Sequence, residues 1–273
     1  MRGQKEITER VIRLAEALGE IRAIGLSGSH ARHTADALSD VDICLYVVGE
    51  IPPDSARRRA YEQLGFSGPI YFDVDFDTSR GDGLLLADRR WDMNWMRIDA
   101  IAAFLGSLEH DLDCAEWVPG GLKTVLPLHD PADEISRLQR QIPPYSDQRS
   151  RYRVQKGLSE AHLSLYGLGW LEKAVARQDH LLFAKHQFLI LEQLYYTLFA
   201  LNRRWFSDEK RLTAITFELS PPNLGERVSA IVTRRDENRD PAGCLRSIEQ
   251  LLADTAAIAR RAYLDLDLPA KWA

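Results

Sequence analysis

The chain has 273 residues and a formal net charge of −5, and 45% of its residues are hydrophobic and 27% are charged. This length supports one large domain or two ordinary domains with cores of their own, and we expect two. The chain is acidic overall and contains no basic stripe, which argues against nucleic acid as a partner. Its densest basic cluster, the arginines at 57–59, lies in a helix-like stretch and is expected to form a solvated face.

Cysteine usage and hydropathy indicate the compartment. Cys44, Cys114 and Cys244 are far apart and odd in number, which suggests neither a disulfide framework nor a metal site. The first 20 residues are amphipathic and charged, without the apolar core of a signal peptide, and no run of 18 apolar residues occurs. We therefore expect a cytoplasmic protein that is neither exported nor membrane-spanning.

The first half of the chain mixes helical and strand-like segments. Apolar residues at helical spacing predict a helix over 7–18, and a strand is predicted over 21–26. β-branched and aromatic residues predict a second strand over 41–48. The further predicted segments, in chain order, are a helix over 54–64, a strand over 69–76, a turn over 79–83 and a strand over 96–104.

The second half changes to a helical period with almost no strand signal. Apolar residues recur at spacings of three and four over 148–176, 180–205, 222–232 and 243–264. These segments predict an all-α helical bundle. The proline-rich segment between the halves is the best boundary, so we expect domains over 1–132 and 133–273.

Two aspartates beside an apolar run suggest a metal site. In the stretch GSHARHTADALSDVDICLYV, residues 28–47, Asp40 and Asp42 precede and enter the second predicted strand. Alternate residues of a strand share a face, so these carboxylates lie side by side. Their repulsion is relieved by a divalent cation that prefers hard oxygen ligands, above all magnesium. Two such ions can clamp the attacking and leaving oxygens of a phosphoryl displacement.

The Gly-Ser step at the start of this stretch suits a phosphate ligand. Gly28 lets the backbone approach a triphosphate closely, and the Ser29 hydroxyl can donate to its oxygens. Arg32 could add a cationic fork to the same phosphates. Taken singly, each piece is also common in turns and helix caps.

Together the two motifs resemble a known signature. A Gly-Ser step, ten intervening residues after Ser29 and then Asp-x-Asp among apolar residues resemble the DNA polymerase beta-like nucleotidyltransferase superfamily. The fuller string, GSxAR followed by SDxDxxxY, is similar to the branch that includes bacterial aminoglycoside nucleotidyltransferases, and it adds Ser39 to the nucleotide-binding set. The resemblance implies an α+β fold in which a small mixed β-sheet is flanked by helices. It also implies two magnesium ions and transfer of a nucleoside monophosphate with release of pyrophosphate.

The resemblance further implies a third carboxylate on a later strand. Asp99 is preferred, because it lies in the strand-like run MRIDAIAAF just before a helical-looking segment, and it would complete the metal and catalytic set with Asp40 and Asp42. The alternatives are three aspartates that would share one face of another strand and could equally be a solvated edge. They are Asp73, Asp75 and Asp77.

Two residues of the helical half are candidates for the reaction. In the family the helical domain closes over nucleotide and acceptor, and Lys210 resembles a lysine of that domain, so it could bind the triphosphate or be a surface lysine. Glu192 lies on the inward face of a predicted helix and could accept the proton of the acceptor hydroxyl or form a structural hydrogen bond.

These observations favour one function and leave two alternatives. The favoured one is a magnesium-dependent enzyme that moves a nucleoside monophosphate, AMP from ATP, to a hydroxyl of a small and possibly aminoglycoside-like molecule. The first alternative keeps the chemistry but uses a protein or tRNA acceptor. The second is a nucleotide-binding partner subunit without catalysis. Acceptor, nucleotide preference and oligomeric state stay open.

Overall fold

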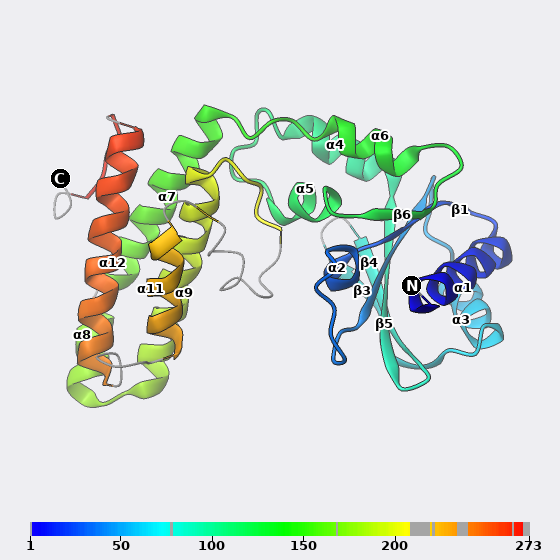
Figure 1. The fold of residues 1–273 in the computed structure, drawn as a ribbon, viewed down its shortest axis with the longest axis horizontal. Helices are drawn as coiled ribbons and strands as arrows, with labels where there is room; N and C mark the ends of the chain where they lie inside the picture. Colours follow the sequence, from blue (N-terminus) through cyan, green and yellow to red (C-terminus); the bar gives the residue numbers. More distant parts are fainter. Residues whose placement is uncertain are drawn as a thin grey trace. The chain divides into compact units, whose positions relative to one another are not determined.

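The computed structural model describes residues 2–76, 79–167, 169–207, 219, 222–233, 240–263 and 265–269 (Figure 1). The contacts between residues divide the chain into two compact units, Met1–Pro143 and Pro144–Ala273. The expected boundary between 132 and 133 would assign helix α6 (Glu134–Gln141) to the helical half. In the structure α6 packs against β1, α4 and α5, so it lies in the first unit.

A mixed six-stranded sheet organises the first unit. Its strand order is β3-β4-β5-β2-β1-β6, and every neighbouring pair is antiparallel except β2 and β5, which run parallel. The strands are β1 (Ile21–Leu26), β2 (Val41–Val47), β3 (Ser67–Phe76), β4 (Ser79–Leu86), β5 (Arg89–Arg97) and β6 (Leu126–His129). This sheet and the helices around it confirm the predicted α+β fold.

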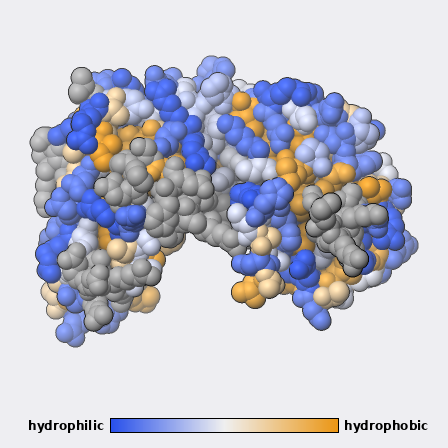
Figure 2. All heavy atoms as spheres, viewed as in Figure 1, coloured by the Kyte–Doolittle hydropathy of each residue, from blue (hydrophilic) through white to orange (hydrophobic). Residues whose placement is uncertain are grey.

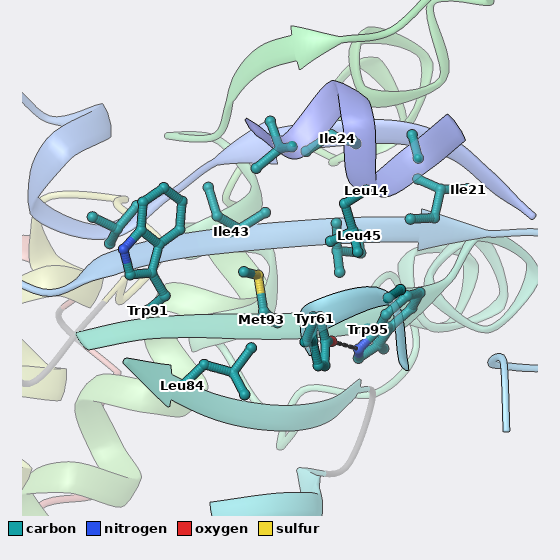
Figure 3. Close-up of a cluster of buried hydrophobic side chains, with 14 of the residues drawn as sticks. Leu14, Ile21, Ile24, Ile43, Leu45, Tyr61, Leu84, Trp91, Met93 and Trp95 are labelled. Carbon is teal, nitrogen blue, oxygen red and sulfur yellow. Dashed lines mark hydrogen bonds between the residues drawn. The ribbon is translucent and has the colours of Figure 1, made fainter. Parts of the chain in front are cut away.

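One face of the sheet carries a hydrophobic core beneath two helices, α1 (Arg2–Leu18) and α3 (Asp54–Gln63). Ile43 and Leu45 of β2 pack there with Leu14 of α1 and Tyr61 of α3 (Figure 3). Because side chains alternate along a strand, burying the odd-numbered residues of β2 turns Asp42 toward the opposite face.

The opposite face is covered near β1 by α6 and by the segment before β6. A side chain at Gly25 would place its Cβ 2.2 Å from Val125 Cγ1 and 3.3 Å from Ile135 Cδ1. Glycine at this position therefore allows close packing of these segments on the sheet. The other helices of this unit are α2 (Gly28–Ala31), α4 (Ile98–Ser107) and α5 (Trp117–Leu122).

Two predicted segments differ from the structure. Residues 79–83 are predicted as a turn, but they belong to strand β4. Residues 96–104 were predicted as a strand, whereas β5 ends at Arg97 and α4 follows it. The buried Ile98, Ile101 and Leu105 of α4 are spaced by three and four residues, which is the helical period.

The arginine cluster at 57–59 also differs from its predicted role, because Arg57 is buried and only Arg58 and Arg59 are exposed. Arg57 donates to both carboxylate oxygens of Asp82 on β4, at 2.8 and 2.7 Å, and to Asp54 and Asp73, each at 2.7 Å. Further donors to Asp82 Oδ2 are Tyr61 Oη at 2.9 Å and Trp95 Nε1 at 3.0 Å. This network ties α3 to the strands beneath it.

The second unit is helical where the structure describes it, as predicted. Helix α9 packs against α7, α8 and α12, and α11 packs against α12. A Cβ at Gly157 of α7 would lie 2.4 Å from Thr197 Oγ1 of α9, so glycine permits the close approach of these two helices. The helices are α7 (Asp147–Tyr166), α8 (Trp170–Arg177), α9 (His180–Leu201), α11 (Pro222–Thr233) and α12 (Pro241–Ala262).

Hydrophilic residues cover most of the visible face of both units, interrupted by smaller hydrophobic patches (Figure 2). Within the described ranges, no helix combines the length and the apolar character that a membrane crossing requires. The three cysteines are buried and unbonded to one another.

Candidate metal and nucleotide site

Three carboxylates meet on the face of the sheet opposite the α1 and α3 helices. Asp40, Asp42 and Asp92 each offer one oxygen, and these oxygens all lie within 4.8 Å of one another. The parallel pairing of β2 with β5 places Asp42 directly beside Asp92. Asp40 precedes Asp42 by two residues and joins the same group, as the alternation of side chains predicts.

The chemistry of this group suits a divalent cation. Three ionised carboxylates at such short range repel one another, and burial of Asp92 adds to the cost of its charge. Carboxylate oxygens are the hard ligands that Mg²⁺ prefers, so a magnesium ion bound at this position would remove the repulsion. The residues present therefore fit the metal that the motif implies.

Asp92 is held in place by two donors. Tyr71 Oη donates to Asp92 Oδ1 at 3.0 Å, and Arg90 Nε donates to the same oxygen at 2.9 Å. Burial, together with the nearby Asp92 carboxylate, raises the pKa of Tyr71 to about 12. The Tyr71 phenol is therefore neutral at physiological pH and keeps the proton that it donates.

Gly28 packs directly against the carboxylate of Asp42. Its φ of +63° lies in the left-handed region, and a Cβ at this position would lie 1.9 Å from Asp42 Oδ2. The preceding residue, Ser27, donates its backbone N–H to the Asp42 carbonyl at 2.9 Å. The Gly-Ser step and the aspartate pair, which are separated in sequence, thus form one structural unit.

The Ser29 hydroxyl and His30 Nε2 are buried atoms without a hydrogen-bond partner among the residues described. Burial lowers the pKa of His30, and the positive charge of Arg89 lowers it further against the opposing effect of Asp40. An unsatisfied buried hydroxyl costs free energy unless a ligand completes it, so Ser29 is suited to donate to a bound group.

Two further residues of the predicted nucleotide-binding set follow the short helix α2. Arg32 caps α2 through its backbone N–H, which donates to the Gly28 carbonyl at 3.3 Å. Ser39 Oγ accepts from the Asp36 N–H at 2.9 Å and donates to Asp36 Oδ1 at 3.0 Å. The Ser39 hydroxyl therefore stabilises the loop that leads to Asp40.

The structure does not bring Asp99 to the carboxylate group, and Asp92 occupies the place expected for it. Along β5, Asp92 is paired with Asp42, whereas Arg97 is paired with Val47 at the other end of β2. Asp99 follows Arg97 in the first turn of α4, is 59% exposed and forms an ion pair with Arg97 at 2.5 Å, which lowers the pKa of Asp99.

The sequence contains a signal for Asp92 that the prediction missed. In the run RRWDMNWMR, buried Trp91, Met93 and Trp95 alternate with Asp92 and Asn94, which is the period of a strand with one apolar face. An acid on the polar face of such a strand has the same pattern as Asp42 on β2.

The alternative acids on β3 are also absent from the group. Asp73 forms ion pairs with Arg57 and Arg80, each at 2.7 Å. The register of β3 against β4 shifts between Tyr71 and Val74, and this irregularity lies at Asp73, which faces the buried arginine. Asp75 is exposed and Asp77 lies outside the described residues.

The two candidate residues of the helical half are Glu192 and Lys210. Glu192 is partly buried on α9, next to the buried Leu191. Lys210 lies outside the described residues. Their roles toward nucleotide and acceptor stay predictions.

Comparison with known proteins supports the class of enzyme. Residues 1–65, which include Gly28, Asp40 and Asp42, match the family model described as Streptomycin adenylyltransferase. No curated protein matches the chain. One similar solved structure is a nucleotidyltransferase-like protein from Exiguobacterium sibiricum 255-15, with 10% identity, a TM-score of 0.45 and coverage of 93% of this chain and 77% of that one. The family match confirms the predicted resemblance and, with it, a nucleotidyltransferase.

Proposed function

We propose that this protein transfers AMP from ATP to a hydroxyl group of a small acceptor and releases pyrophosphate, in a magnesium-dependent reaction. The observation that carries the proposal is the meeting of Asp40, Asp42 and Asp92, with Gly28 packed against Asp42. This arrangement is built around the segment that matches the adenylyltransferase family model.

The proposed roles of the residues follow from their positions. Asp40, Asp42 and Asp92 would hold magnesium, which when bound neutralises phosphate charge and aligns the attacking and leaving oxygens. Ser29 donates its hydroxyl to a phosphate oxygen, and Arg32 contributes a positive charge to the same group. The protein therefore contributes positioning and charge neutralisation rather than a covalent intermediate.

The helical half supplies the remaining proposed roles. Lys210 binds the triphosphate as a point charge, and Glu192 accepts the proton of the acceptor hydroxyl. Residues of this half would thus serve both the nucleotide and the acceptor.

An aminoglycoside is the acceptor class that we propose. The support is the name of the matched family, Streptomycin adenylyltransferase, and the net charge of −5, which suits a cationic acceptor. A protein or tRNA acceptor and a non-catalytic nucleotide-binding role are the alternatives.

Pyrophosphate release from ATP and Mg²⁺ in the presence of streptomycin and a panel of other aminoglycosides tests the proposal. We expect release that depends on both the metal and one of the acceptors, together with an acceptor that gains the mass of AMP. Label from ATP that enters protein or RNA of a cell extract instead would favour a macromolecular acceptor. Metal-dependent ATP binding without transfer to any acceptor would favour the non-catalytic role.

Substitution Gly28→Ala tests the contact with Asp42. Because the new Cβ would lie 1.9 Å from Asp42 Oδ2, the carboxylate must move, and a misplacement of about 1 Å costs about 100-fold in rate. We expect that loss in pyrophosphate release. Gly49→Ala is the matched control, since Gly49 has a φ of +79° but a Cβ added there would have no neighbouring atom within 4 Å. Similar losses in both variants would attribute the effect to backbone strain.

A further inference from the structure

Four residues form a row across four strands beside the carboxylate group. Tyr71 on β3 pairs with Gly83 on β4, Gly83 pairs with Asp92 on β5, and Asp92 pairs with Asp42 on β2. Paired residues of neighbouring strands point to the same face of a sheet. The row therefore runs from the edge of the sheet to the Asp42 carboxylate on a single face.

Gly83 makes it possible for Tyr71 to reach Asp92. A Cβ at Gly83 would lie 2.3 Å from Tyr71 Cε1 and 2.6 Å from Cδ1, so the phenol ring occupies the space above the glycine. The ring crosses β4 in this way, and its hydroxyl donates to Asp92 Oδ1 from two strands away, at 3.0 Å. Any side chain at position 83 would displace the ring.

Arg90 acts on the same oxygen from the start of β5. Its Nε lies 2.9 Å from Asp92 Oδ1, and its Cζ lies 5.4 Å from the centroid of the Tyr71 ring. Both donors therefore converge on Oδ1, so that among the residues described Oδ2 is the oxygen that could be offered to a cation. The positive charge of Arg90 also offsets part of the repulsion among the three carboxylates.

We propose that Tyr71 and Arg90 are positioning residues that orient Asp92 for metal binding, with Gly83 as the gap that lets Tyr71 reach it. The inference rests on the proposed function, because it assigns these residues to the metal site proposed there. Donors that hold a ligating carboxylate are worth about 10-fold to 100-fold in metal affinity.

Substitution Tyr71→Phe removes one donor without changing charge and keeps the ring above Gly83, so the sheet should be retained. Titration of the protein with Mn²⁺, followed by the electron paramagnetic resonance signal of the free ion, measures metal affinity without turnover. We expect about 10-fold weaker binding. We also expect the Mg²⁺ concentration for half-maximal rate to rise by a similar factor, with the rate at saturating Mg²⁺ changing much less.

Arg97→Gln is the matched control, because Arg97 on the same strand bonds the aspartate two residues further on, Asp99, away from the carboxylate group. It should leave Mn²⁺ affinity unchanged. Gly83→Ala should weaken Mn²⁺ binding as Tyr71→Phe does. The variant that carries both substitutions should bind Mn²⁺ at least as tightly as the single variant with the lower affinity.

The possible results separate this inference from the function on which it rests. Wild-type protein that binds Mn²⁺ and releases pyrophosphate, with Tyr71→Phe binding Mn²⁺ equally well, overturns the positioning role alone. An equal loss in Arg97→Gln overturns it as well, because the effect would then be general. Wild-type protein that neither binds Mn²⁺ nor releases pyrophosphate overturns the proposed function.

Discussion

Substitution Asp42→Asn is expected to reduce pyrophosphate release at least about 10³-fold, which corresponds to about 4 kcal/mol of activation free energy. Asp42 stands between Gly28 on one side and Asp92 on the other, so it is the central member of the carboxylate group. An amide there removes one negative charge and one hard oxygen ligand while keeping the shape of the side chain. Single-turnover rates with the best acceptor of the panel, together with Mn²⁺ affinity, measure the effect.

Asp99→Asn is the control for this experiment. Asp99 is exposed and paired with Arg97, away from the carboxylate group, so the substitution should leave turnover within about 2-fold of wild type. The opposite ranking, with Asp99→Asn inactive and Asp42→Asn active, would contradict the assignment of Asp42 rather than Asp99 to the metal site. Asp92→Asn should resemble Asp42→Asn, because it removes the third ligand.

Substitution Arg57→Met is expected to destabilise the first unit by about 3 to 5 kcal/mol. Arg57 is 1% exposed, and its guanidinium is the cation that Asp82, itself fully buried, contacts through both oxygens. Removing the arginine leaves a buried carboxylate without a counter-charge, which costs more than the ion pair itself contributes. Replacement of both partners, Arg57→Met with Asp82→Leu, should cost clearly less than the sum of the two single changes.

Hydrogen exchange of the full chain measures this effect where it arises. Peptides from β4 and β5 should lose protection in Arg57→Met, while peptides from α9 in the other unit serve as an internal reference. Arg59→Met is the matched control, because Arg59 lies on the same helix and is exposed. Equal loss of protection in both variants would show that a general change in α3, rather than the buried ion pair, is responsible.

The buried network also bears on the carboxylate group. Asp82 and Gly83 are neighbours on β4, and they point to opposite faces of the sheet. Asp82 anchors β4 to α3 through Arg57, and Gly83 accommodates the ring of Tyr71 on the other face. Loss of the ion pair between Arg57 and Asp82 is therefore expected to shift β4 and, with it, the position of Asp92 on the neighbouring strand β5.

Local patterns were enough to predict the elements next to the Asp-x-Asp motif. Strand β1 has the predicted bounds, 21–26, and β2 begins at the predicted residue, 41. The pairing of Asp40 with Asp42 followed from the two-residue period of a strand, which involves no residue outside it. The predicted role of Gly28 beside a phosphate stays a prediction, and its contact with the Asp42 carboxylate was not predicted.

The amino-acid sequence by itself determined that Asp40 and Asp42 lie together and that the second half is helical, because each depends on the local spacing of residues, and the α+β class followed from the resemblance carried by the Gly28 and Ser29 step and the aspartate pair. Only the tertiary structure decided that Asp92 rather than Asp99 completes the carboxylate group and that Arg57 is buried. The physical reason is that strand order and register are set by pairing between distant segments. Which acid lies beside Asp42 depends on the parallel alignment of β5 with β2, and no local period encodes that alignment.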